Sequence, residues 1–574
     1  MKIIGSVSRR RRPARRVLLA KPCLRLEPLE DRSLPSALPG FAGLAFSDDP
    51  RFIPPDTHAA VGPDHVVEVV NASVAVFDKD TRAKLFQRQL QPFFARVGAA
   101  TPTFDPVVAY DELSGRFIVA TLEQVPGNQT SFVDVAVSNT SNPLDGFAEM
   151  HRIELTEVAG GQRTFADYPK IGYNADAIVI SFNMFGFTGG YFNVQVLSID
   201  KPTALDLNPA TLTRFRADVP GGRAHQTMAV ATMHGAAPGD PMYFVEEAGF
   251  ANGRALRVVR MTDVLNATPT FANFNIPVTP YGFPPLATQP GGAVRTNDTR
   301  VLNAAWRGDR LVASQTVGSG GAARARWYEF NTGGTPALTQ SGQIAPGAGV
   351  HNYFPSIEIA ADGSLGMTYM QSSFNEFVSM YVTGRTEAEP LGVMRTPLVA
   401  KAGEAFLRGA ERAGDYSGIS VDPEDGTLFW AANEYARSSP IGANWATWIT
   451  VFGASWLPPA SSGTSASDEG EEFESVGDEE MAEPRPLLPL LAESVDESDA
   501  DGGGPEAVSA LSRSFLGVPV AQVEGSGLQT RARPRGPRPF LWVPVAQVEG
   551  AADAADGARD WLPGWRRRRS RPRS

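Results

Sequence analysis

The sequence has few of the residues that build disulfide, metal or membrane chemistry. Its 574 residues include a single cysteine, Cys23, which excludes an intramolecular disulfide framework. No apolar run reaches the roughly 18 residues that a membrane-spanning helix needs. The six histidines form no HExxH or HxH pair, and no glycine-rich phosphate loop of the usual spacing occurs, so neither zinc hydrolysis nor P-loop chemistry is indicated. Stability must therefore come from packing.

Glycine and proline are abundant instead, with 56 and 46 copies, beside 42% hydrophobic and 9% aromatic residues. This composition suits a turn-rich β protein. The net charge of -11 is unevenly distributed: residues 1–36 are basic, residues 468–506 are strongly acidic, and residues 507–574 are basic again. The net charges of these three segments cancel, so the central body, residues 37–467, carries the whole net charge of -11. Such a body is not expected to bind nucleic acid.

The N-terminal segment, residues 1–36, is a predicted export or targeting segment. Arg9 to Arg12 and Arg15-Arg16 precede only Val17 to Ala20, a shorter apolar run than the roughly 7–15 residues of a secretory signal. Leu24 to Ser36 then reads LRLEPLEDRSLPS. This stretch resembles the LExLExR-type N-terminal motif of large exported proteins of planctomycete bacteria. The resemblance implies an extracytoplasmic location: secreted, periplasmic or cell-surface. A disordered basic tail is the alternative.

Residues 37–459 carry a pattern of strand, tight turn and strand that recurs roughly every 50 to 70 residues, which is typical of radial β repeats. Each copy supplies a four-stranded antiparallel sheet that must stack on neighbouring copies to bury both faces. The pattern occurs seven times. The first strands are expected at Thr57 to Val61, Val107 to Tyr110, Tyr168 to Tyr173, Gln226 to Met233, Arg300 to Trp306, Phe354 to Ile359, and Tyr416 to Val421.

The last copy, Tyr416 to Phe452, has only three strand-length runs before Pro458-Pro459. Propellers close by letting one terminus complete the last blade, because closure removes exposed sheet edges. Phe41 to Phe46 precedes the first copy and is the expected fourth strand. The sequence therefore predicts an all-β fold: a seven-bladed β-propeller of four-stranded antiparallel blades, closed by an N-terminal strand in the last blade, with disordered termini. A six-bladed ring, with the fourth copy as an insertion, is the alternative.

Three phrases in the body carry a further resemblance: PPDTHAAVGPDHVVEVVN, DYPKIGYNADAIVISFN and GDYSGISVDPEDGTLFWAANEY. They resemble bacterial secreted β-propeller proteins of largely unknown function, some of them loosely grouped with sialidase-type propellers. The similarity covers Pro54 to Phe452. It implies the fold and an exported fate, whereas function has to be argued from the site.

Two segments follow the predicted propeller. Residues 460–508 are rich in Ser, Gly, Asp and Glu with few apolar side chains, which cannot offset the entropy of ordering, so a disordered acidic linker is expected. Residues 509–574 form a low-complexity tail in which VPVAQVEG occurs twice and which ends in an arginine-rich run. The duplicated motif is either a short binding element or a product of duplication. The arginines predict electrostatic contact with anionic envelope polymers, or simply a solvated tail.

Candidate ligand-binding residues lie just before the predicted first strands. In a propeller these positions meet on one face around the central channel, so acidic and aromatic side chains there predict a site that grips a cation or stacks on a sugar ring. The alternative is that each aspartate caps its own turn. The candidates are Asp56, His58, Asp105, Asp167, Tyr168, His225, Asp298, His351, Tyr353, Asp415 and Tyr416.

No catalytic residue is predicted. A sialidase-like site needs three arginines around a carboxylate and a tyrosine beside a glutamate; Arg223 and Arg300 lie near the right face, but the repeat places no third arginine. No cofactor is expected, with calcium as the alternative.

The sequence thus predicts a monomeric, exported or cell-surface binding module for carbohydrate or a surface protein. The alternatives are a polysaccharide-acting hydrolase or lyase of sialidase-like propeller type, and a structural envelope component. Whether the protein is an enzyme is left open, and the lack of a predicted catalytic residue argues against it.

Overall fold

The computed structural model describes residues 38–48, 52–100, 102–206, 212–249, 253–408, 412–439 and 443–460. The chain divides into units of residues 1–523 and 524–574, and all described residues lie in the first. The predictions for the basic segment 1–36, for the acidic linker beyond residue 460 and for the tail 509–574 lie outside the described residues. Within the described ranges, no helix has the length and hydropathy needed to cross a bilayer.

Four antiparallel sheets contain four strands each. Their apolar runs are short, rich in β-branched residues and separated by turns such as Asp111 to Gly115, which is why they form strands. The sheets are β2 (His58–Val61), β3 (His65–Val70), β4 (Ser73–Asp78) and β5 (Lys84–Gln89); β6 (Thr103–Asp111), β7 (Arg116–Val125), β8 (Thr130–Val137) and β9 (Glu149–Glu154); β25 (Val350–Ile359), β26 (Leu365–Ser373), β27 (Glu376–Arg385) and β28 (Leu398–Lys401); and β29 (Gly418–Val421), β30 (Leu428–Ala436), β31 (Trp445–Gly453) and β1 (Gly40–Ala45).

Three further groups of four strands join into one thirteen-stranded sheet, because two first strands pair in parallel with a third, β15. The short strand β10 (Val158–Ala159) also belongs to it. The groups are β11 (Gln162–Tyr173), β12 (Ala177–Gly186), β13 (Tyr191–Asp200) and β14 (Arg214–Asp218); β15 (Ala229–His234), β16 (Met242–Glu247), β17 (Ala255–Thr262) and β18 (Thr270–Pro277); and β21 (Val301–Arg307), β22 (Arg310–Ser319), β23 (Ala322–Asn331) and β24 (Ala337–Gln343).

The remaining described elements are short and lie in the connections. Strands β19 (Ala287–Gln289) and β20 (Gly292–Val294) form a separate hairpin. The helical turns are α1 (Leu90–Phe93), η1 (Ala95–Val97), η2 (Pro143–Asp145), α2 (Lys201–Ala204), η4 (Gly222–Ala224) and η5 (Ala454–Trp456).

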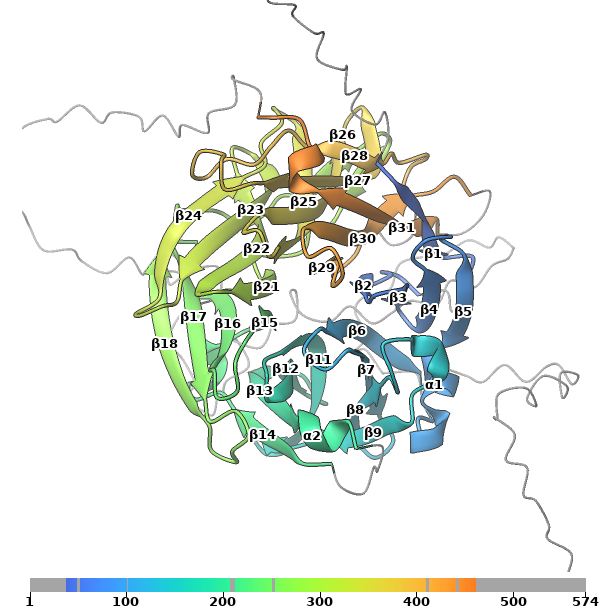
Figure 1. Cartoon of the computed structure of the whole chain (residues 1–574), viewed down its shortest axis with the longest axis vertical. Helices are drawn as coiled ribbons and strands as arrows, with labels where there is room; N and C mark the ends of the chain where they lie inside the picture. Colours follow the sequence, from blue (N-terminus) through green and yellow to red (C-terminus); the bar gives the residue numbers. More distant parts are fainter. Residues whose placement is uncertain are drawn as a thin grey trace, which may run out of the picture. The chain divides into compact units, whose positions relative to one another are not determined.

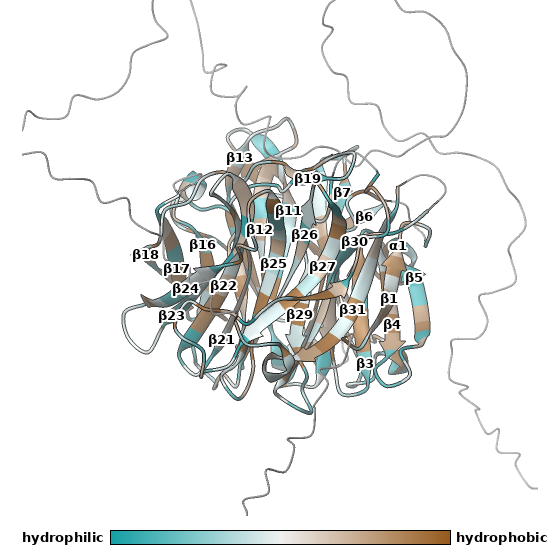
Figure 2. Ribbon diagram, turned by 90° about the horizontal axis from the view of Figure 1, so that it is seen from above, coloured by the Kyte–Doolittle hydropathy of each residue, from teal (hydrophilic) through white to brown (hydrophobic). Residues whose placement is uncertain are grey.

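The first strands of successive groups contact one another in a closed order: β2, β6, β11, β15, β21, β25, β29 and again β2. Figure 1 shows these strands around a centre, with the fourth strands β5, β9, β14, β18 and β24 on the outside. Seen from the side, the strands run between the two faces of the ring (Figure 2). This arrangement is a β-propeller, and the prediction of an all-β fold with four-stranded antiparallel sheets is confirmed.

The ring is closed by the N-terminal strand, as the sequence predicts. Strand β1 pairs antiparallel with β31, with Phe41 opposite Ile449. The fit is tight at Gly43, where a Cβ atom would lie 2.4 Å from Oγ1 of Thr447. Beside it, the backbone N–H of Leu44 donates to Glu68 Oε2 at 2.9 Å. The first group of strands therefore holds the closing strand by a hydrogen bond as well as by packing.

Apolar side chains fill the spaces between neighbouring sheets. Between the β2–β5 and β6–β9 sheets, Val67, Val76, Val119 and Ala136 belong to one buried cluster. Each strand turns alternate side chains toward its two neighbouring sheets, so these runs read as continuous apolar stretches in the sequence.

Candidate functional site

The seven first strands line a central channel. It encloses a cavity of about 60 Å³. We call the end at which these strands begin the channel mouth, and the end at which they finish the channel exit. Each strand contributes to the cavity wall, through Val61, Val107, Lys170, Thr232, Asn303, Ser356 and Ile419.

The backbone at the channel mouth adopts a conformation that non-glycine residues rarely take. Left-handed φ angles cost roughly 1–3 kcal/mol each for non-glycine residues, and such outliers cluster at functional sites. The register of β6, β11 and β25 shifts beside these residues, which re-aims their side chains. Positive φ angles occur before three of the first strands, at Asp56 (50°), Thr227 (45°) and Asn297 (61°), and within three others, at Asp105 (49°), Tyr168 (54°) and Phe354 (50°).

This geometry corrects one expectation. The sequence places the candidate residues before the first strands, but β6, β11 and β25 begin earlier and pass through the irregularity. Five candidates therefore lie within these three strands, namely Asp105, Asp167, Tyr168, His351 and Tyr353, and His58 is the first residue of β2.

Aspartates from four groups of strands meet at the mouth. Asp105 Oδ2 accepts from the hydroxyl of Tyr416 at 3.1 Å and from the backbone N–H of Tyr168 at 3.2 Å. Asn71 joins two of the aspartates: its amide donates to Asp56, and its Oδ1 accepts from the backbone N–H of Asp105 at 3.0 Å. Asp56 is 2% exposed, and none of the described residues donates a hydrogen bond to its Oδ1.

The side chains of Tyr168 and Tyr416 contact each other beside the aspartates at the mouth. Their rings stack with centroids 4.7 Å apart, and the hydroxyl of Tyr168 donates to the backbone oxygen of Asp415 at 2.7 Å. Two cationic side chains also contact the tyrosines. Cζ of Arg300 lies 4.2 Å from the ring centroid of Tyr168, and Nζ of Lys170 lies close to the centroids of both rings. The aromatic groups that the sequence offers for sugar stacking are therefore already in contact with each other and with these cations.

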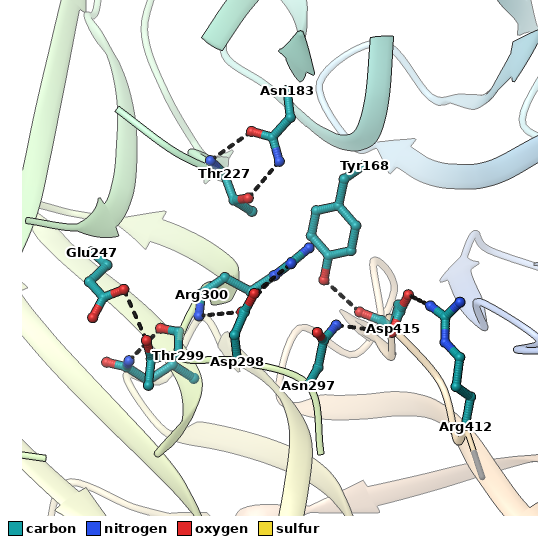
Figure 3. Close-up of polar contacts among 11 residues, drawn as sticks. Tyr168, Asn183, Thr227, Glu247, Asn297, Asp298, Thr299, Arg300, Arg412 and Asp415 are labelled. Carbon is teal, nitrogen blue, oxygen red and sulfur yellow. Dashed lines mark hydrogen bonds and ion pairs between the residues drawn. The ribbon is translucent and has the colours of Figure 1, made fainter. Parts of the chain in front are cut away.

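Two arginines lie at the mouth, each beside its own aspartate. Arg300 forms a bidentate pair with Asp298, at 2.7 and 2.6 Å, as Figure 3 shows. Arg412 donates to Asp415, which also accepts from Asn297 Nδ2 at 3.0 Å. Both guanidinium groups are thus directed by carboxylates, and neither forms part of a three-arginine clamp.

The crowding of carboxylates controls their protonation. Burial raises the pKa of Asp56 well above its usual value, and Asp105 and Asp415 raise it further. Burial likewise raises the pKa of Asp105 and of Asp415. For Asp167, burial followed by repulsion from Asp105 raises the pKa to about 7. Asp298 differs, because Arg300 outweighs the effect of burial and lowers its pKa. We call Asp56, Asp105, Asp167 and Asp415 the mouth aspartates.

A small side groove adjoins the mouth. Asn183 and Thr227 form two hydrogen bonds across it, at 2.7 and 2.8 Å, and Glu247 accepts from Thr299 at 2.9 Å. Arg300 lines this groove and also contacts Tyr168 at the mouth; Figure 3 shows both Arg300 and Tyr168. A ligand held at the mouth would therefore meet further polar groups on this side.

The other candidates lie elsewhere. His58 lines the channel cavity below the mouth, and burial followed by Lys170 lowers its pKa to about 4. His225 is paired with Glu246 at 2.6 Å at the edge of the side groove. His351 accepts from the backbone N–H of Ala323 at 3.2 Å. Tyr353 is fully buried and donates to Ser372 at 2.9 Å.

The channel exit holds a cluster that the sequence analysis missed. His234, at the end of β15, places Nδ1 3.0 Å from Glu112 Oε2 and Nε2 2.9 Å from Glu358 Oε1. Burial alone would lower the pKa of His234, but the two carboxylates raise it to about 9. We call Glu112, His234 and Glu358 the exit clamp, because its members follow or end β6, β15 and β25 and so bridge the channel.

Metal binding gains no geometric support. Among the residues that the structure describes, no group of three or more His, Cys, Asp or Glu side chains is arranged to hold a metal ion. The calcium alternative stays a prediction.

Comparisons with known proteins identify neither a family nor a function for this chain. No protein-family model and no curated protein matches this sequence. Among solved structures, extracellular domains 1–2 of Drosophila Semaphorin 1a are similar over 72% of this chain and 88% of that one, at 8% identity and a TM-score of 0.35. A protein of unknown function from Dyadobacter fermentans covers 61% and 94%, at 9% identity and 0.34. The WD40 domain of SCAP from fission yeast covers 68% and 81%, at 9% and 0.29. Similarity at this level carries no argument about function.

Proposed function

We propose that this chain is an exported, cell-surface or secreted β-propeller of seven blades that binds its ligand at the channel mouth. The four separate sheets and the three groups within the larger sheet support the blade count. The N-terminal motif supports export. The fold provides a rigid platform, and the mouth aspartates provide the recognition chemistry.

One observation carries the proposal: the mouth gathers like charges. Asp105, Asp167 and Asp415 remain partly exposed although burial opposes their ionisation, and repulsion from a neighbouring aspartate adds to this effect at Asp105 and Asp167. A ligand that brings a positive charge or several hydrogen-bond donors would relieve this repulsion, because an opposite charge favours the ionised carboxylate. Groups with perturbed pKa values in a concave site are candidates for function on these grounds.

The same geometry narrows the ligand. Tyr168 and Tyr416 contact each other and the neighbouring cations, so the proposed recognition is by charge and hydrogen bonds and not by stacking on a sugar ring. We therefore favour a carbohydrate that carries amino groups. A surface protein that presents a lysine or arginine side chain is the other partner that the mouth suits.

The test is thermal unfolding of the full chain with chitosan oligosaccharides, neutral oligosaccharides and a lysine-rich peptide, each with calcium and with a chelator. A ligand at 100 times its Kd stabilises a fold by about 2.7 kcal/mol, so binding is readily seen. We expect an amino-group-bearing probe to stabilise the protein and the effect to weaken in Asp167→Asn.

The matched control is Asp263→Asn, an exposed aspartate that also has positive φ (56°) and directly follows β17. It should leave binding unchanged. If no cationic probe stabilises the protein, or if Asp167→Asn and Asp263→Asn behave alike, the mouth is not the binding site.

A further inference from the structure

Lys170 is a buried lysine on β11 whose amine has no acceptor. The residue is 7% exposed. Its Nζ lies 4.4 Å from the ring centroid of Tyr168 and 4.2 Å from that of Tyr416. Within the described ranges, neither a hydrogen bond nor an ion pair reaches this atom. Since lysine is almost never buried without a partner, the position calls for an explanation.

The other buried lysine of the described residues provides a contrast. Lys201 is 4% exposed and lies 4.8 Å from the ring of Tyr173, so it too has an aromatic neighbour. Its Nζ, however, is 2.7 Å from Asp111 Oδ2. Burial lowers the pKa of Lys201 too, but its ion pair with Asp111 opposes that effect, and no carboxylate of the described residues pairs with Lys170 in this way.

Lys170 faces a space that a small molecule can occupy. It lines the channel cavity, which continues past Thr232 and Asn303 to Glu112 at the exit. A water molecule needs roughly 10–15 Å³ of such space, so about 60 Å³ holds several waters or one compound of a few heavy atoms. Lys170 thus lines this cavity and also contacts the rings of Tyr168 and Tyr416.

The surroundings favour the neutral amine. Burial, followed by the nearby charge of Arg300, lowers the pKa of Lys170 to about 7, against roughly 10.4 for an ordinary lysine. About half of the Lys170 side chains then carry a free lone pair at neutral pH. Desolvation beside another cation is a known way of making a lysine nucleophilic toward carbonyl groups.

We propose that Lys170 is a nucleophilic amine that forms an imine with small aldehydes or ketones admitted through the channel exit. The nitrogen lone pair attacks the carbonyl carbon, and the amine proton passes to the carbonyl oxygen, which gives a carbinolamine. The hydroxyl then leaves as water with a proton taken up from the solvent, while the nitrogen lone pair forms the C=N bond and gives the protonated imine. The protonated imine keeps its positive charge beside the Tyr168 and Tyr416 rings, which stabilise cations. This site is separate from the proposed binding site at the mouth.

The test is reductive trapping on the full chain. The protein is treated with acetaldehyde and cyanoborohydride at pH 7, the hydride reduces the imine to a secondary amine, and peptide mapping by mass spectrometry locates the ethyl group. We expect Lys170 to be labelled at least about tenfold faster than exposed Lys84, because so little of an ordinary lysine is neutral at this pH. Its rate should rise with pH through a midpoint near 7.

Lys201 serves as the internal control, since it is equally buried and should stay unlabelled. Lys170→Arg should lose the label and leave that of Lys84 unchanged. The proposal is overturned if wild-type Lys170 is labelled no faster than Lys84, or if its rate rises only near the pKa of ordinary lysines. Both results come from the wild-type chain, so they hold whether or not the arginine variant folds.

Discussion

The two ends of the channel use charged residues in opposite ways. At the mouth, burial raises the pKa of all four aspartates, and repulsion from another mouth aspartate raises it further for Asp56, Asp105 and Asp167. At the exit, His234 lies within hydrogen-bond distance of Glu112 and Glu358. The mouth thus crowds like charges, although Arg412 pairs with Asp415 there, whereas the exit places one histidine between two carboxylates. Crowding of this kind is typical of a binding or active site, and pairing is typical of a structural one.

Topology does not explain the difference. Both clusters draw residues from groups of strands far apart in the sequence, with His234 separated from Glu112 by 122 residues and from Glu358 by 124. Both therefore connect opposite parts of the ring. What differs is the kind of charge that is brought together: mainly carboxylates at the mouth, and a histidine with two carboxylates at the exit. Substitutions at the two ends should therefore change the free energy of unfolding in opposite directions.

The largest effect is expected from removing the histidine of the exit clamp. His234→Leu leaves Glu358 buried without a cation, and loss of one partner of a buried pair costs about 3–5 kcal/mol. Urea unfolding measures the loss directly. His351→Leu is the matched control, because His351 is also buried but accepts only a backbone N–H; an equal loss in both variants would show that the clamp has no special role.

The pH dependence of the exit should follow His234. Its folded-state pKa of about 9 lies above the ordinary 6.5, so folding takes up a proton between these values. The stabilisation is fully present below pH 6.5 and is lost as pH rises through about 9. Unfolding free energies measured between pH 6 and 10 should fall for the wild type and fall less for His234→Gln. Parallel profiles would contradict the assignment.

At the mouth, neutralising a carboxylate should stabilise the fold. Asp56→Asn removes repulsion with Asp105 and Asp415, keeps an oxygen for Asn71, and retains a residue type that tolerates positive φ. We expect a gain of about 0.5–2 kcal/mol at neutral pH. A loss of stability in urea unfolding would mean that the aspartate is structural.

The smallest effect is expected from a single hydrogen bond. Tyr416→Phe removes the hydroxyl that donates to Asp105 Oδ2, which should cost about 0.5–1.5 kcal/mol. Without this donor the carboxylate is less favoured, so the pKa of Asp105 should rise further. Carbon-detected NMR titration of the aspartates follows this shift, and an unchanged pKa would show that the hydrogen bond does not set the protonation of Asp105.

Much of the fold was predictable because its turns are local. Asp111 to Gly115 and Asp362-Gly363 mark hairpins by residue type alone, and strand β1 could be assigned because the last repeat lacked a fourth strand. The four mouth aspartates all lie beside the start of a predicted first strand, so the repeat allowed the sequence analysis to propose them as one group. His351 and Tyr353 share that position, yet their side chains contact other groups because of the irregularity in β25.

The exit clamp and Lys170 could not be found in the same way. The clamp depends on residues from three separate turns or strand ends, and nothing local distinguishes Glu112 from an exposed turn residue. A histidine ending an innermost strand was the one available indication. Lys170 stands out only once its missing acceptor is known, and this requires the positions of all its neighbours.

Urea unfolding of the wild type, Asp167→Asn and His234→Gln at about pH 5 and pH 8 tests the contrast between the two ends most directly. Asp167 has a folded-state pKa of about 7 against an ordinary 3.8, so the wild type loses stability as pH rises through this window. We predict that Asp167→Asn is more stable than the wild type at pH 8 and closer to it at pH 5, while His234→Gln is less stable at both. If Asp167→Asn is instead destabilised at pH 8, the mouth aspartates hold the fold together and are not strained for binding.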